Sequence, residues 1–160
     1  MNTTELTIPD GSSNQNFFYY DEKAGFHTIS VSGTGVTGDS FVQEVQPASA
    51  SYLSFISTPG PSTAGQESGE FTVVVRDEFG NLVTDGEWNI SLSSDSGGPY
   101  EFRDSSGGSA VSEITILNGS FTEDFYYYDE LAGDHTISVN NNSLTGASTT
   151  HTVEPASVSQ

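Results

Sequence analysis

The chain contains no cysteine among its 160 residues. Disulfide bonds and thiolate metal sites are therefore excluded. A small extracellular domain often relies on disulfides, but a module of about a hundred residues can be stable on its hydrophobic core alone. We expect any domain of this chain to depend on such a core.

Basic residues are almost absent: 3 Lys and Arg residues stand against 22 Asp and Glu residues, which gives a formal net charge of −19. Binding to nucleic acid needs Lys or Arg to replace phosphate counterions, so that class of partner is excluded. Attraction to an anionic membrane surface is excluded on the same ground. Dissolved Ca²⁺ remains as a partner, and an acidic, solubilising surface is the simpler interpretation.

Long apolar runs are also missing. No stretch approaches the roughly 18 consecutive apolar residues of a membrane-spanning helix. Met1 is followed by polar residues rather than by a basic and then an apolar segment, so no signal peptide is expected in this piece. If the protein is secreted, its export signal lies outside this sequence.

The strongest pattern that is present is an internal repeat. NFFYYDEKAGFHTISV at 16–31 matches DFYYYDELAGDHTISV at 124–139, an offset of 124 − 16 = 108 residues. The same offset aligns ELTIPDGS at 5–12 with EITILNGS at 113–120, VTGDS with LTGAS, and VQPAS with VEPAS. Such agreement, with roughly half of the paired positions identical, does not arise by chance.

The repeat predicts a domain organisation. Residues 49–156 form one complete unit, residues 1–48 are the C-terminal half of a preceding unit, and residues 157–160 begin the next linker or repeat. Pro47 and Pro155 stiffen the short connections, as in a linear array. Residues 1–48 then lack the first strands of their own unit, which further chain or a neighbouring molecule must supply.

Within the complete unit the apolar pattern alternates with a period of two, which predicts β-strands. The expected strands cover 52–56, 71–76, 88–92, 111–116, 121–128, 135–139 and 149–153. Short strands at this spacing, without any helical pattern, predict an all-β, immunoglobulin-like two-sheet sandwich. We expect the single Trp88 to lie between the sheets.

Two segments carry a family resemblance. Asp77-Glu-Phe-Gly-Asn81-Leu-Val and Phe125-Tyr-Tyr-Tyr-Asp-Glu-Leu-Ala-Gly133-Asp-His-Thr-Ile137 resemble the two characteristic segments of bacterial and archaeal Ig-like tandem repeats of the Big, invasin/intimin type. His27 and His135 depart from that pattern. The resemblance implies an Ig-like sandwich used as a stalk, spacer or adhesive module, without catalysis.

His27 and His135 recur at the same place in both copies, whereas His151 is replaced by Gln43. We interpret the recurring imidazole as a structural group that binds backbone carbonyls at a corner between two strands, rather than as a catalytic group. The aromatic run 125–128 should place two rings in the core and two outside, where they pair across strands or stack on glycans.

Carboxylates cluster in loops, and hard Ca²⁺ prefers such oxygen ligands. No EF-hand spacing is present, and solvated carboxylates are the alternative. The candidate calcium ligands are Asp77, Glu78, Asp85, Asp21, Glu22, Asp129 and Glu130.

Four sequons make Asn2, Asn89, Asn118 and Asn141 candidate glycosylation sites and support surface exposure. The complete unit contains no lysine, which excludes a Lys–Asn isopeptide bond within it.

The expected function is a non-catalytic extracellular repeat that acts as stalk or spacer of a microbial cell-surface protein. Its partners would be neighbouring repeats, identical subunits, or glycans on another cell surface. The alternative is a subunit of an extracellular filament, assembled by strand complementation between Ig-like units. A carbohydrate-binding module that uses exposed tyrosines is a third possibility. No nucleophile–base pair or phosphate-binding loop points to an enzyme.

Overall fold

The structure is a computed structural model that describes residues 5–157. The chain divides into two compact units, an N-terminal unit that ends at Val45 and a C-terminal unit that begins at Gln46. The described residues form strands, turns and loops without a helix, so they contain no helix long and apolar enough to cross a membrane. The two units are described separately.

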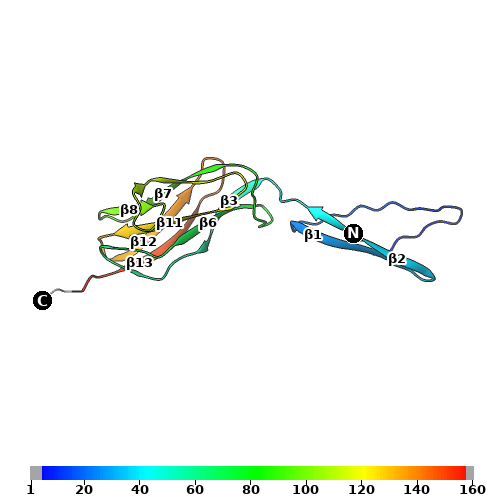
Figure 1. The fold of residues 1–160 in the computed structure, drawn as a ribbon, viewed down its shortest axis with the longest axis horizontal. Helices are drawn as coiled ribbons and strands as arrows, with labels where there is room; N and C mark the ends of the chain where they lie inside the picture. Colours follow the sequence, from blue (N-terminus) through cyan, green and yellow to red (C-terminus); the bar gives the residue numbers. More distant parts are fainter. Residues whose placement is uncertain (1–4, 158–160) are drawn as a thin grey trace. The chain divides into compact units, whose positions relative to one another are not determined.

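The C-terminal unit is a sandwich of two sheets (Figure 1). The first sheet has the order β10 (Glu113–Ile116), β7 (Trp88–Ser94), β12 (Gly133–Asn140), β13 (Ala147–Glu154) and β4 (Ser62–Thr63). The second has the order β3 (Ala50–Ser57), β6 (Phe71–Asp77), β11 (Thr122–Asp129), β8 (Tyr100–Arg103) and β9 (Ala110–Val111), and β5 (Gln66–Glu67) also pairs with β11. All neighbours are antiparallel except β13 and β4. The expected Ig-like β-sandwich is confirmed.

Side-chain alternation builds the core between the sheets. Along β11, Phe125 and Tyr127 are fully buried, whereas Tyr126 and Tyr128 are half-buried and face outward. The Phe125 ring stacks on Phe71 of β6, with 5.1 Å between ring centroids. The predicted division of the aromatic run into two inward and two outward rings is confirmed.

Several short strands and one side chain differ from the expectation. The single strand predicted over 111–116 is divided into β9 and β10, which belong to different sheets. β4, β5 and β8 were not predicted, because two to four residues are too few to show a period. Trp88 is only half-buried and packs at the edge of the core, with its indole so close to Gly86 that a side chain there would collide with it.

The N-terminal unit contains one hairpin, β1 (Gly25–Gly33) and β2 (Val36–Val45) (Figure 1). Gly25 pairs with Val45 there, as Gly133 pairs with Val153 in the β12–β13 hairpin, so both partners are shifted by 133 − 25 = 108. The two hairpins therefore have the same register.

A glycine turn also recurs at the same place in both copies. Ser12 N donates to Pro9 O at 3.0 Å, and Ser120 N donates to Leu117 O at 2.9 Å. These turns need a positive φ, which Gly11 (+80°) and Gly119 (+92°) provide. The repeat detected in the sequence thus has the same local structure in both copies.

Two segments differ between the copies. Residues 5–8, the counterparts of β10, form no strand. Residues 14–21, the counterparts of 122–129, form no strand. In the C-terminal unit β11 lies between β6 and β8 and bonds to both. The described part of the N-terminal unit contains no counterpart of either strand, and a lone segment without partners cannot form a ladder.

Candidate functional site

The loop after β6 is organised by one buried carboxylate, Asp77. Its Oδ1 accepts hydrogen bonds from Phe79 N at 3.0 Å and Asn81 N at 2.8 Å. Its Oδ2 accepts from Asn81 Nδ2 at 2.8 Å and from Ala48 N at 2.9 Å. The carboxylate therefore closes its own loop and also holds the linker residue Ala48.

The chemistry of this loop explains its sequence. Gly80 has φ +88°, a conformation that other residues rarely adopt, and Arg76 Nη1 donates to the Gly80 carbonyl at 2.6 Å. Burial raises the pKa of Asp77, but the hydrogen bonds from Asn81, Ala48 and Phe79 outweigh it and hold the pKa below its usual range. Asp77 is a structural carboxylate at the end of the linker.

A second buried cluster lies at the turn between β11 and β12. The Tyr127 hydroxyl donates to Asp129 Oδ2, and Leu131 N donates to Asp129 Oδ1 at 2.8 Å. His135 Nε2 lies 2.8 Å from the Leu131 carbonyl and 3.6 Å from Asp129 Oδ2. The predicted contact of the His135 imidazole with a backbone carbonyl at the corner between two strands is confirmed.

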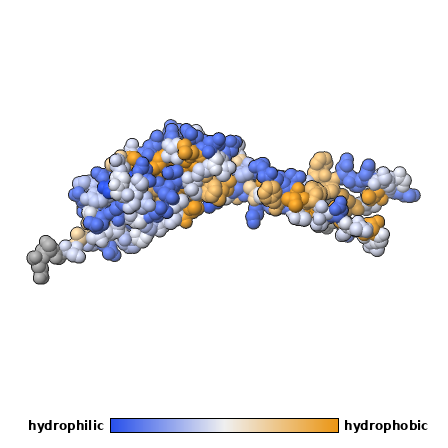
Figure 2. Space-filling view, in the orientation of Figure 1, coloured by the Kyte–Doolittle hydropathy of each residue, from blue (hydrophilic) through white to orange (hydrophobic). Residues whose placement is uncertain are grey.

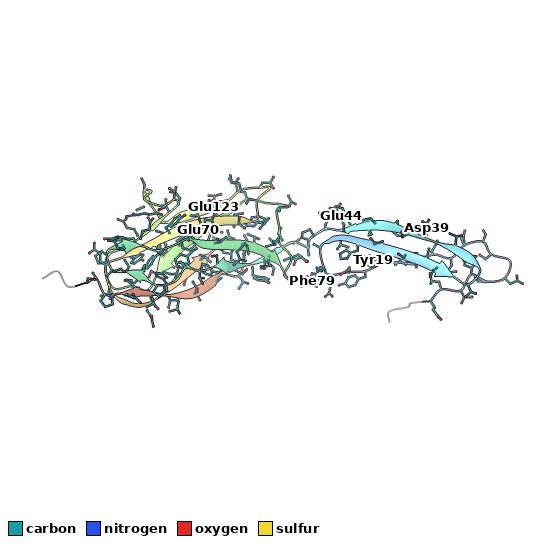
Figure 3. The ribbon with its side chains drawn as sticks, turned by 60° about the horizontal axis from the view of Figure 1, so that its bottom comes forward. Tyr19, Asp39, Glu44, Glu70, Phe79 and Glu123 are labelled. Carbon is teal, nitrogen blue, oxygen red and sulfur yellow. The ribbon has the colours of Figure 1, made fainter. Side chains whose placement is uncertain are left out.

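The N-terminal unit repeats this corner. The Tyr19 hydroxyl donates to Asp21 Oδ2, Lys23 N donates to Asp21 Oδ1 at 2.9 Å, and His27 Nε2 lies 2.8 Å from the Lys23 carbonyl. Figure 3 shows Tyr19 beside the β1–β2 hairpin. Tyr19 nevertheless keeps 41% of its surface exposed, whereas Tyr127 is fully buried.

The electrostatics of the corner favour a fixed charge state. Burial raises the pKa of Asp129, but hydrogen bonds from Tyr127, Ser96 and Leu131 outweigh it and lower the pKa. Burial, followed by the hydrogen bond to Asp129, raises the pKa of Tyr127 far above its usual range. Tyrosine therefore stays protonated and aspartate stays ionised near neutral pH, which maintains their hydrogen bond.

Sequence reasoning missed a Ser–His contact inside the sandwich. Ser62 Oγ of β4 lies 2.9 Å from His151 Nε2 of β13. The imidazole packs edge-on against Phe71 and Tyr127, and its residue is only 2% exposed. Burial lowers the pKa of His151. A Ser–His pair can serve as nucleophile and base, but both residues of this pair are buried, with Ser62 8% exposed.

Within the described residues, the candidate calcium ligands do not form a cluster that could hold a metal ion. Both oxygens of Asp77 and of Asp129 already accept hydrogen bonds, and Glu78, Asp85 and Glu130 are exposed. Asp21 accepts bonds within its own corner, as described above, and Glu22 accepts one from Tyr20 at 3.0 Å. Within residues 5–157, no three His, Cys, Asp or Glu residues are grouped to hold a metal ion. Calcium binding stays a prediction.

The outward tyrosines are engaged with charged neighbours. Tyr126 donates to Glu70 Oε2 at 2.9 Å, and Tyr128 donates to Glu130 Oε1 at 3.1 Å. The Arg103 guanidinium lies 5.4 Å from the Tyr128 ring centroid. This arrangement stabilises the sheet surface and leaves the Tyr128 ring partly covered against glycan stacking.

The glycosylation candidates lie at different depths. Asn89 and Asn118 are exposed, whereas Asn141 is half-buried and its Nδ2 donates to the Asn89 carbonyl at 2.8 Å. Asn2 lies outside the described residues. The Oδ1 atoms of Asn89 and Asn118 accept hydrogen bonds from Thr115 Oγ1 and Gly86 N, both at 3.0 Å. A glycan is attached at Nδ2, and the exposure of Asn89 and Asn118 suits attachment better than the half-buried Asn141.

No protein-family model matches this chain, and no curated protein sequence matches it. Among solved structures, it is similar to a glycosyl hydrolase family 2 member from Bacteroides cellulosilyticus, with 14% identity, a TM-score of 0.53, and coverage of 82% of this chain and 18% of that one. A β-glycosidase from Bacteroides vulgatus gives 14% identity, a TM-score of 0.54, and coverage of 82% and 18%.

Domains 4 and 5 of the S-layer protein SbsC give 18% identity and a TM-score of 0.47, with coverage of 82% of this chain and 58% of that one. The chain thus spans less than a fifth of the two glycosidases and under two thirds of the SbsC fragment. At these identities the glycosidase matches show the fold alone: the chain has the β-sandwich fold of domains within larger proteins.

Proposed function

We propose that this chain is part of a tandem array of Ig-like repeats that acts as an extracellular stalk or spacer of a microbial surface protein. The observation that carries the proposal is the structural equivalence at an offset of 108 residues. The Tyr–Asp–His corner, the glycine turn and the hairpin register each occur twice. Repetition of a whole structural unit is the defining property of linear arrays.

The linker supports the same function. Asp77 holds Ala48 directly after Pro47, so the connection is fixed at its entry to the C-terminal unit. A spacer is built from units with defined ends, and this hydrogen bond holds the first residues of the C-terminal unit in place. The corresponding Pro155-Ala156 at the other end gives the same sequence at the start of the next connection.

The strongly negative net charge of the chain fits an extracellular protein. The net charge of −19 keeps such a protein soluble and separate from nucleic acid. Its partners would be adjacent repeats and, in an adhesive version, glycans or another cell surface. The similarity to parts of glycosidases shows a shared fold alone, and the role that we propose is non-enzymatic.

A filament subunit is the second candidate function. It is favoured by one observation, the apolar side chains that remain exposed on the N-terminal unit. Complementation by a second molecule would cover them.

Two measurements test the stalk proposal. Antibodies against the C-terminal unit should label intact cells of the source organism, and external protease should abolish the label. Chains built from one, two and four copies of residues 49–156 should increase in maximum dimension linearly in small-angle scattering. Labelling only after permeabilisation, or a dimension that grows like a compact globule, would contradict the proposal.

A further inference from the structure

The N-terminal unit has an apolar face that its counterpart buries (Figure 2). Leu6 is 49% exposed and Ile8 55% exposed, whereas their counterparts Ile114 and Ile116 are 4% and 0% exposed. Phe17 is 41% exposed, and its counterpart Phe125 is fully buried. We call this surface, made of Leu6, Ile8, Phe17, Tyr19, Ile29 and Val31, the acceptor face.

The C-terminal unit shows what covers each part of such a face. Phe55, Phe71 and Phe102 have ring centroids 6.3, 5.1 and 5.8 Å from that of Phe125. A groove between residues 15–21 and the β1–β2 hairpin, lined by Phe17, Tyr19 and Ile29, lies where such rings would insert. The occupant must therefore carry aromatic side chains at these positions.

Backbone pairing defines the occupant further. β11 pairs with β6 on one side and β8 on the other, so its counterpart 14–21 needs one strand on each side. β7 lies between β10 and β12, whose counterparts are residues 5–8 and β1. One occupant must supply strands like β6, β7 and β8 together, which a single donor strand cannot do.

The order of the strands along the chain indicates whether the occupant belongs to the same polypeptide or to a second copy. In the C-terminal unit these three strands all precede β10, and β9 ends at Val111, separated from Glu113 by Ser112 alone. The counterpart of Glu113 is Glu5. A donor joined directly ahead of residues 1–4 needs no loop closure beyond that of a normal unit, whereas a second copy would have to open its own sandwich first.

We infer that the acceptor face binds, in the same polypeptide, a multi-strand segment with the pattern of residues 49–108, N-terminal to residues 1–4, which are the sequence counterparts of 109–112. This rests on the proposed repeat organisation and adds the partner. The occupant is a half-sandwich with at least three strands, not one complementing strand. The two halves form one cooperative unit.

The test is a fusion in which residues 49–108 of this chain precede residues 1–160. Amide hydrogen exchange at 14–21 and in β1 and β2 should slow by at least about a hundredfold relative to the unfused chain. The dye ANS should bind the unfused chain and lose this binding in the fusion. Exchange in β11 and β12 serves as the internal control, since the C-terminal unit is unchanged.

A matched variant separates docking from simple attachment. Phe17→Asp in the fusion should restore fast exchange at 14–21 and leave β11 protected. Three results would overturn the inference: no protection in the fusion, equal protection of the unfused chain by a peptide with the sequence of β6 or β8 alone, or a dimer of the unfused chain with its acceptor face already protected. Cell labelling does not enter this test, so its failure would remove the stalk proposal and leave the docking result unaffected.

Discussion

At the scale of single residues, Asp129 shows how one buried carboxylate fixes a corner. It is 1% exposed and accepts hydrogen bonds from a hydroxyl of β11 and a backbone amide of the following turn. Such a group stabilises the fold because its removal leaves buried donors without acceptors.

We expect Asp129→Ala to lower the free energy of unfolding of the C-terminal unit by about 2–4 kcal/mol, because Tyr127 and Leu131 lose a charged acceptor. Urea denaturation followed by fluorescence of Trp88, the only tryptophan, measures this unit specifically. The adjacent exposed Glu130→Ala is the control and should change stability by about 0.5 kcal/mol or less. Equal effects of both variants would contradict the role given to Asp129.

His151 gives a pH dependence with a definite sign. Burial lowers its pKa in the folded state, so the unfolded state binds the proton more readily. The stability of the neutral form is complete above about pH 6.5 and declines as the pH falls from there toward the folded pKa. His135 of the adjacent strand adds repulsion when protonated, and Ser62 and Tyr127 are the polar groups that face the ring.

The sequence itself provides the matched variant, His151→Gln, because Gln43 occupies this position in the other copy. The urea midpoint of the unmodified chain should fall between about pH 7.5 and about pH 5.5. The variant should show a smaller fall over the same range. An unchanged slope in the variant would assign the pH dependence to other groups.

At the scale of elements, β11 and residues 14–21 are identical at four of eight positions and have different structures. The difference follows from their neighbours: β11 has β6 and β8 beside it and Phe71 stacked on Phe125. A strand is therefore specified by its pairing as well as by its own residues.

This contrast predicts unequal effects of one substitution at two equivalent positions. Phe125→Ala should destabilise the C-terminal unit by about 3–5 kcal/mol, because it opens a cavity in a packed core. Phe17→Ala should change the Trp88-monitored transition by about 0.5 kcal/mol or less, since Phe17 lies in the other unit and is already partly exposed. A similar loss in both variants would show that Phe17 contributes to the C-terminal core.

The elements also show which strands a sequence can reveal. Long strands of the C-terminal unit, such as β6 and β11, were predicted within a few residues of their bounds. β4 and β5 have two residues each and depend on partners far along the chain, for example β13 for β4. These strands form because they pair with distant strands, and the local pattern of apolar residues does not indicate such pairing.

At the scale of the whole molecule, the net charge of −19 acts against compactness. Like charges repel one another in the folded state, and added salt screens this repulsion. The acidic character that favours solubility therefore has a cost in stability at low ionic strength.

We expect the urea midpoint of the C-terminal unit to rise when NaCl increases from about 0.02 M to about 0.5 M, as the screening length shortens. CaCl₂ at the same ionic strength tests the calcium prediction. Stabilisation equal to that of NaCl indicates screening alone, and a larger, saturable effect abolished by a chelator would indicate a specific calcium site. No rise with NaCl would contradict the repulsion argument.

The sequence by itself determined the corner, the glycine turn and the hairpin register of this protein. The Tyr–Asp–His corner joins residues two and four positions apart, and it forms in both copies whether or not the rest of the sandwich is present. The repeat, the turn glycines and the hairpin register follow from the same short-range interactions. They could be predicted because all the partners lie within one short segment.

Tertiary structure alone decided which of these groups are buried and which distant groups meet. Tyr19 and Tyr127 make the same hydrogen bond, yet one is 41% exposed and the other fully buried. Ser62 meets His151 across 151 − 62 = 89 residues, and Asp77 binds Ala48 across 77 − 48 = 29. Burial and long-range contacts depend on strands far away in the sequence, so they exist only where the whole sandwich has assembled.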